Sequence, residues 1–295
     1  MMTKLKRVVL FFALLPLVWL GCNNPSTQTE EEPPKTEIFS GGVKIDYNVC
    51  GNADTTLLFV HGWCINQTYW EHQVEAFCDR YKVVTIDLPG FGNSGNGREE
   101  WTIEDYGEDV SAVISLLGLK HVILVGHSMG GDVILEAALK QKDEVIKLVG
   151  VDNFKDVGVF FDESTRAEID AFVNLLKQDF DEVIKGYADT YLFHVSTDSL
   201  VKESVINDYV NSNTLAAIGS FESLINYVEK EYEQLGRLEI PLSLINSNAT
   251  PTLNAGLDST GVHYRVYDAG TTGHFPMIEA PDKFNELLEI AISSN

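Results

Sequence analysis

The chain has 295 residues, of which 44% are hydrophobic and 10% aromatic, a composition that suits a globular protein with a large buried core. Its 21 basic and 44 acidic residues give a formal net charge of -23 at pH 7, so nucleic acid, whose phosphates would be repelled, is disfavoured as a partner. The acidity instead indicates a soluble surface and neutral or cationic ligands.

The N-terminal residues predict a signal peptide over 1–21 and a flexible tether over 22–36. Three basic residues precede the apolar run Val8–Leu20, which is short for a bilayer span and interrupted by Pro16. The run ends at Leu-Gly-Cys22, which resembles the lipobox of bacterial lipoproteins, although Trp19 stands where that pattern prefers leucine. The resemblance implies that Cys22 is acylated and holds the protein at a membrane of the bacterial cell envelope, periplasmic or at the surface. Plain secretion after cleavage elsewhere is the alternative.

Between residues 36 and 151, apolar runs predict strands that alternate with helices. Thr36–Ser40 and Val43–Asn48 flank Gly41-Gly42, which is a hairpin signal. Further strands are expected at 55–61, 82–87, 121–126 and 146–151, and helices at 68–81, 102–117 and 129–139. Because the later strands are continuous apolar runs, the alternation predicts a parallel sheet with helices on both faces.

From residue 157 to 236 the pattern becomes helical, with Ile169, Phe172 and Leu176 among the apolar residues at helical spacing. The strand pattern resumes at 242–246 and 262–267, and the chain closes on a helix with Phe284 and Leu288 on its inner stripe. The long helical stretch therefore interrupts an otherwise regular order of strands and helices.

Gly126-His127-Ser128-Met129-Gly130 places a serine between two glycines directly after the apolar run 122–125. A strand that runs into so tight a turn holds its serine in a strained conformation, with the hydroxyl exposed above the sheet. The residues that follow form a helix whose N-terminus faces the serine. The pattern favours a nucleophilic Ser128, and its alternative is a glycine-bounded helix start.

Cys22 aside, three cysteines remain, and an odd number cannot all pair. Cys78 shares a helical stripe with apolar residues such as Phe77, so we expect it to be a buried free thiol. Cys64 follows the loop at Trp63 and is expected near the pocket, but a catalytic thiol is disfavoured beside Ser128. No Cys/His spacing indicates a metal site.

With three further motifs, the chain resembles the α/β-hydrolase fold family from about Lys44 to Ala291. Residues 57–63 resemble the family's third strand and oxyanion loop, 87–95 the turn after its fourth strand, and 273–279 the loop of its catalytic histidine. The resemblance implies an α/β fold with a mostly parallel eight-stranded sheet and helices on both faces. It also implies a hydrolase domain over 37–295, with a helical cap at about 157–238 inserted after strand 6.

The resemblance makes Ser128 the nucleophile and His274 its base, in the family's chain order of nucleophile, acid and histidine. A serine hydroxyl needs such a base within hydrogen-bond reach. The backbone N–H groups of Trp63 and Met129 would form the oxyanion hole. His61 and His127, which adjoin the motifs, are expected to hold their loops, and no cofactor is expected.

The acid departs from the family pattern, in which an aspartate usually follows the strand represented here by 241–245. The chain instead reads Asn246-Ser247-Asn248, with no carboxylate until Asp258. Some members carry the acid one strand earlier, where Asp152 stands directly after 148–151. We therefore predict Asp152 as the acid and keep Asp258 as the second candidate; the alternative is that Asp152 only caps its own turn.

Three functions fit these residues. The first is a serine hydrolase that cleaves an ester, thioester or lactone of a small-molecule acyl substrate through an acyl-enzyme. Its acyl pocket would be shaped by the cap and by Trp63, Met129, Phe160, Phe161 and Phe275, although Phe160 and Phe161 also suit the core. The second is carbon-carbon bond hydrolysis or cofactor-free peroxidation on the same triad, and the third is a ligand-binding member without turnover. Epoxide hydrolase and dehalogenase activities are disfavoured, because those relatives carry an aspartate at the position of Ser128.

Overall fold

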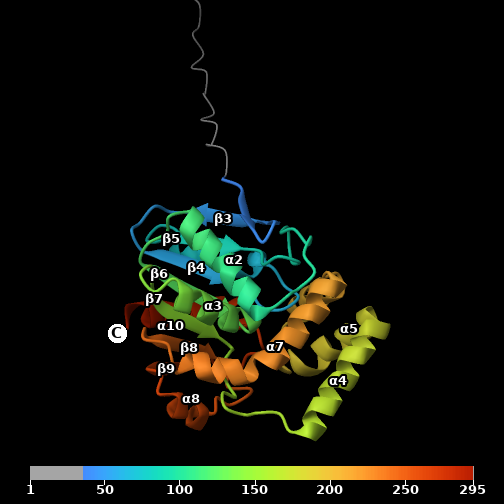
Figure 1. Cartoon of the computed structure of the whole chain (residues 1–295). Helices are drawn as coiled ribbons and strands as arrows, with labels where there is room; N and C mark the ends of the chain where they lie inside the picture. The colour runs from blue at the N-terminus through green and yellow to red at the C-terminus, as the bar shows by residue number, and fades with distance from the viewer. Residues whose placement is uncertain (1–35, 295) are drawn as a thin grey trace, which may run out of the picture. The chain divides into compact units, whose positions relative to one another are not determined.

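The computed structural model describes residues 36–294 (Figure 1). The predicted signal peptide, the lipidation of Cys22 and the tether up to residue 35 lie outside the described residues. Within residues 36–294, no helix is long and apolar enough to cross a membrane.

Seven strands form the main sheet in the order β3-β5-β4-β6-β7-β8-β9. All neighbouring pairs are parallel except β3 and β5. The strands are β3 Tyr47–Cys50, β4 Thr56–Val60, β5 Lys82–Ile86, β6 Val122–His127, β7 Val145–Val151, β8 Leu242–Asn246 and β9 Tyr264–Asp268. Every residue of β4, β6 and β8 is buried, as expected for parallel strands covered on both faces.

Helices cover the two faces of this sheet. On one face α2 (Ile103–Leu116) packs against α3 (Met129–Lys140), and Figure 1 shows both in front of the sheet with α10 (Pro281–Ser293) behind it. The short helices η1 (Gln67–Trp70), α1 (Glu71–Phe77) and α9 (Pro276–Glu279) pack with one another, and α1 and α9 also contact α10.

Four helices stand between β7 and β8 in the chain: α4 Glu163–Gln178, α5 Phe180–Tyr191, α6 Ser199–Val210 and α7 Thr214–Leu235. Asp162, Asp179, Asp198 and Asn213 cap their N-termini by accepting hydrogen bonds from backbone N–H groups. α7 packs against α3 and α4, and α5 packs against α4 and α6. Figure 1 shows α4 and α5 beyond the layers that cover the sheet.

The α/β fold predicted from the motifs is confirmed, but the expected eight-stranded sheet is wrong. The strand expected at 43–48 divides at Asp46 into β2 (Val43–Ile45) and β3, and β2 pairs only with β1 (Ile38–Ser40) in a separate two-stranded sheet. The helix expected at 68–81 is shorter, consisting of η1 and α1. A short helix, α8 (Asn254–Thr260), precedes β9.

The expectation of a free Cys78 is also wrong, because Cys78 forms a disulfide with Cys50, with 5.7 Å between their Cα atoms. The bond joins the end of β3 to the end of α1. Cys78 is also only half-buried, although Trp70 and Phe77 of the same stripe are buried, and the stripe gave no sign of the strand that packs beside it. Cys64 is free and buried; it accepts a hydrogen bond from the Ser212 hydroxyl, and burial raises the pKa of its thiol.

Candidate active site

Ser128 lies in the turn between β6 and α3, with φ 50° and ψ -124°. This left-handed conformation is strained for a residue with a side chain. Hydrogen bonds hold the turn on both sides: the Ser128 N–H donates to the Val151 carbonyl at 2.9 Å, and its carbonyl accepts from Gly131 N–H and Asn153 Nδ2, both at 2.7 Å. The structure therefore fixes the serine in the sharp bend that the sequence predicted.

The two glycines around Ser128 are required by close backbone approach. A Cβ on Gly126 would lie 2.3 Å from the carbonyl oxygen of Gly130, and a Cβ on Gly130 would lie 2.6 Å from the carbonyl oxygens of Val60 and His61. These contacts bring the start of α3 directly against the end of β4. A side chain at either position would push the turn away from its neighbours.

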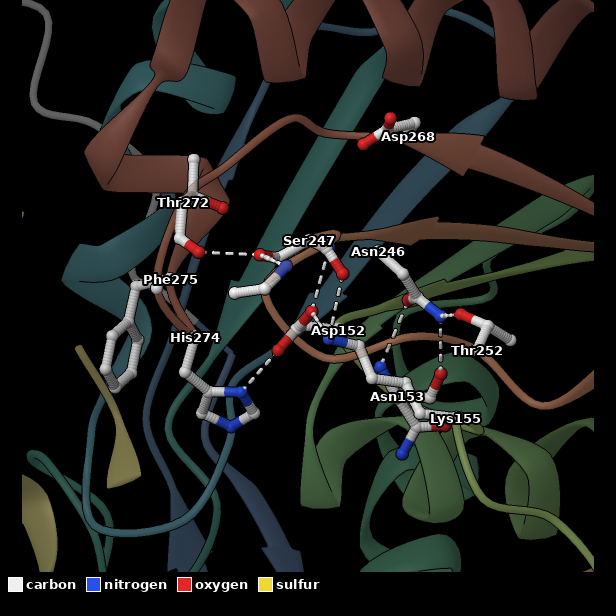
Figure 2. A network of polar contacts seen from close by, with 12 residues as sticks. Asp152, Asn153, Lys155, Asn246, Ser247, Thr252, Asp268, Thr272, His274 and Phe275 are labelled. Carbon is white, nitrogen blue, oxygen red and sulfur yellow. Dashed lines mark hydrogen bonds and ion pairs between the residues drawn. The ribbon is translucent and has the colours of Figure 1, made fainter. Parts of the chain in front are cut away.

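His274 lies in the loop between β9 and α9, and its Nδ1 is 2.6 Å from Oδ2 of Asp152, as Figure 2 shows. The His274 N–H donates to the Leu192 carbonyl at 2.8 Å, which ties this loop to the end of α5. Asp152 follows β7 directly and has φ 47°. The sheet order therefore brings together two residues that are 122 positions apart in the chain.

The other carboxylate oxygen of Asp152, Oδ1, accepts from the Ser247 N–H at 2.9 Å and lies 2.5 Å from Nζ of Lys155. Burial alone would raise the pKa of Asp152, but the hydrogen bond and charge of His274 and the charge of Lys155 outweigh it and lower the pKa. Asp152 is therefore a carboxylate at neutral pH. Lys155 was not among the predicted site residues, although its position three residues after Asp152 could have indicated it.

Asp258, the second candidate for the acid, lies elsewhere. It is exposed on α8 and accepts a hydrogen bond from the Tyr264 hydroxyl at 2.7 Å. It does not line the cavity that contains His274. Between the two carboxylates, the structure brings Asp152, and not Asp258, against His274.

His61 and His127 hold neighbouring loops through both ring contacts and hydrogen bonds. His61 Nδ1 donates to the Gly62 carbonyl at 2.7 Å, and its Nε2 accepts from the Leu88 N–H at 2.9 Å. His127 Nε2 donates to the His274 carbonyl at 2.7 Å, and its ring lies 4.7 Å from that of His274. Burial and the neighbouring His274 lower the pKa of His127 to about 3, so this ring is neutral.

Of the two residues predicted for the oxyanion hole, Met129 follows Ser128 and lines the same cavity, whereas Trp63 does not line it. Met129 is the first residue of α3, so its N–H has no acceptor one turn earlier in the helix. Trp63 follows Gly62, where a Cβ would lie 2.6 Å from the His127 ring. The loop that bears Trp63 therefore packs against the end of β6, next to Ser128.

A cavity of about 920 Å³ opens over Ser128 and His274, and both side chains, together with Met129, line it. Most of its apolar wall comes from α5, α7 and the segment that follows α5, through Tyr187, Tyr191, Leu192, Phe193, Leu224 and Val228. The region predicted to be a cap therefore supplies most of this wall.

Four of the five residues predicted to shape the pocket do not line this cavity. Phe160 is 52% exposed and packs on Tyr232, and Phe275 is fully buried. The Trp63 ring packs among aromatic residues, and its Nε1 donates to the Ala217 carbonyl at 2.8 Å. Phe161 also lies outside the wall. The motifs identified residues near Ser128 in the chain, whereas the wall is made by helices far from it in sequence.

The comparisons agree with this architecture. A family model described as alpha/beta hydrolase fold matches residues 55–281. Over 261 residues the chain is 26% identical to the uncharacterized hydrolase YugF of Bacillus subtilis, covering 83% of this chain and 93% of that protein. It is 27% identical over 169 residues to the dihydrolipoyllysine-residue acetyltransferase component of the acetoin cleaving system of Cupriavidus necator, covering 55% of this chain but only 45% of that protein.

Among solved structures, the fold is similar to that of the esterase EaEST from Exiguobacterium antarcticum, with a TM-score of 0.77 and 21% identity over 88% of this chain and 99% of that one. A further relative, epoxide hydrolase 3 of Xenopus tropicalis, is 32% identical over 111 residues, which cover 37% of this chain and 30% of that protein.

Proposed function

The chain belongs to the α/β-hydrolase fold family and is an α/β-hydrolase enzyme, and we propose that it is a serine hydrolase that cleaves a carboxylic ester, thioester or lactone through an acyl-enzyme. The observation that carries this proposal is the 2.6 Å contact between His274 Nδ1 and Asp152, at a cavity that Ser128 also lines. A carboxylate, an imidazole and a serine hydroxyl at one cavity are the three groups that acyl transfer requires.

In the first half of the reaction, the Ser128 hydroxyl attacks the acyl carbon and His274 Nε2 accepts its proton. Asp152 accepts the hydrogen bond from His274 Nδ1–H, which holds the proton on Nδ1, leaves Nε2 free to act as the base and stabilises the imidazolium that forms. The leaving alcohol or thiol then takes the proton from His274. An acyl group remains on Ser128.

The backbone N–H groups of Met129 and Trp63 would stabilise the oxyanion, each contributing on the order of 3 kcal/mol in the transition state. Water then enters the cavity, His274 removes its proton, and the hydroxide attacks the acyl-enzyme. The second oxyanion collapses with return of the proton to Ser128 and release of the acid. No cofactor takes part in this sequence.

Labelling with a fluorophosphonate probe tests the proposal. We expect the probe to label the wild-type protein and to spare Ser128→Ala, while Ser164→Ala, which removes an exposed hydroxyl on α4, is labelled like the wild type. Hydrolysis of a short p-nitrophenyl ester should follow the same pattern. If no labelling occurred at any pH, the serine-hydrolase proposal would be wrong and the chain would be a ligand-binding member of the fold.

We also propose that the protein is lipid-anchored through Cys22 at a membrane of the cell envelope. The Cys50–Cys78 disulfide supports this location, since disulfides persist mainly in oxidising compartments outside the cytosol. Metabolic labelling with a fatty acid is expected to tag the wild-type protein and Cys64→Ser but not Cys22→Ser. A tag that survives loss of Cys22 would contradict the anchor.

A further inference from the structure

The cavity wall next to Ser128 carries two carboxyl groups that the proposed reaction does not use. Asp132 lies in the first turn of α3, four residues after Ser128, and Glu231 comes from α7; both line the cavity. Asp132 is only 2% exposed, and its Oδ1 receives no hydrogen bond from an N–H or hydroxyl group of residues 36–294. Because buried polar atoms are nearly always hydrogen-bonded, this oxygen lacks a donor unless the neighbouring carboxyl group of Glu231 is protonated.

Asp132 and Glu231 lie against each other, with a hydrogen bond between their carboxyl groups that requires one shared proton. Burial raises the pKa of Asp132 to about 7, and burial together with the charge of Asp132 raises that of Glu231 well above its usual range. Near pH 7 the pair is therefore poised between holding this proton and carrying a second negative charge.

The groups around the pair do not neutralise it. Asn153 donates a hydrogen bond to Asp132 Oδ2 at 3.3 Å but carries no charge, and Asp156 adds a further negative charge. The nearby Tyr227 hydroxyl donates to Glu136 at 2.8 Å and not to the pair. Lys155 is the one lysine or arginine among the described residues that line the cavity, and its Nζ lies against Asp152. Residues 36–294 contain no group of three or more side chains arranged to hold a metal ion. A ligand cation with N–H donors would supply the charge and the hydrogen bonds that this part of the wall lacks.

We propose that Asp132 and Glu231 bind a protonated amine on the substrate, so that the pocket selects esters, thioesters or lactones that carry a primary ammonium group. This inference rests on the serine-hydrolase function proposed above. On binding, the ammonium donates N–H hydrogen bonds to both carboxylates, and the proton that they shared passes to water. One turn of α3, about 5.4 Å, separates Asp132 from Ser128, a span that a short aliphatic chain bridges.

The test uses Ser128→Ala, which lacks the nucleophile, and two esters of equal length in isothermal titration calorimetry. Methyl 6-aminohexanoate carries the ammonium, and methyl heptanoate has a methyl group in its place. At pH 8 we expect the amino ester to bind at least about tenfold more tightly, as expected for charge-assisted hydrogen bonds. This preference should fall as the pH is lowered to 6, because the carboxyl pair then keeps its proton. The affinity for methyl heptanoate, which is neutral, should not change over the same pH range.

In the same background, Asp132→Asn and Glu231→Gln should each lower the preference at least about fivefold, and unchanged affinity for methyl heptanoate would verify that the cavity is intact. Glu229→Gln is the matched control, since Glu229 is exposed on the same helix, and it should keep the preference. Equal binding of the two esters, or a preference that survives both substitutions, would overturn the proposal. Because binding is measured without turnover, failure of the fluorophosphonate labelling would refute the hydrolase function separately.

Discussion

Replacing Asp152 by Asn is the sharpest test of how the cavity residues act together. In the structure Asp152 accepts from His274 Nδ1, from the Ser247 N–H and from Lys155, so an amide that keeps its oxygen toward Ser247 and Lys155 presents its NH₂ group to His274. The imidazole must then accept at Nδ1 and carry its proton on Nε2, where it cannot take the proton of Ser128. The expected loss in kcat is on the order of 10⁴, or about 5.5 kcal/mol of transition-state stabilisation.

The assay is steady-state hydrolysis of p-nitrophenyl butyrate, with KM expected to stay within about threefold because no substrate contact is removed. Asp258→Asn is the matched control: it makes the same chemical change on exposed α8, where the carboxylate contacts Tyr264, and should leave kcat unchanged. A loss of only a few-fold in Asp152→Asn would refute the assignment of the acid. A large loss of kcat in Asp258→Asn with little loss in Asp152→Asn would instead make Asp258 the acid.

Three further predictions concern stability, each measured by urea unfolding. The folded-state pKa of Asp132, about 7, lies above its ordinary value of 3.8, so the wild type loses stability as the pH rises from 4 to 7. The free energy of unfolding of Asp132→Asn should therefore rise by about 2 to 3 kcal/mol relative to that of the wild type between pH 5 and pH 8. A difference between the two proteins that stays constant over this pH range would contradict the prediction. Replacing both Cys50 and Cys78 by Ser removes a cross-link over 28 residues and should cost about 3 kcal/mol, with reductant then having no further effect. Gly130→Ala should destabilise by at least about 2 kcal/mol because its Cβ meets two carbonyl oxygens, whereas Gly186→Ala, in open space on α5, should stabilise by about 0.5 kcal/mol; similar effects at both positions would refute the steric reason.

The proposed ammonium site and the proposed triad share α3, which links substrate selection to chemistry. Ser128 precedes the helix and Asp132 lies in its first turn, so a cation held at Asp132 positions the acyl group relative to the turn. The partial positive charge at the helix N-terminus favours a carboxylate there and lowers the cost of ionising the pair when the amine binds.

Features encoded by covalent neighbours were predictable from the sequence. The glycines around Ser128 predicted the bend because their effect is local: only glycine leaves room for the close backbone contacts at both ends of the turn. The buried strands were predicted for the same reason, since a continuous apolar run carries its own signal. The single strand expected at 43–48 was wrong because the chain divides at Asp46 into β2, which pairs with β1, and β3, which pairs with β5. The apolar pattern of the sequence does not show which partner each half has.

Only the tertiary structure decided which carboxylate lies against His274, which cysteine pairs with Cys78, and which carboxyl group faces Asp132. Each of these contacts joins residues brought together by sheet order or helix packing. Sequence spacing left Asp152 and Asp258 open and gave no sign of Glu231, because the energies that select such partners come from burial and charge in a site that exists only after the chain has folded.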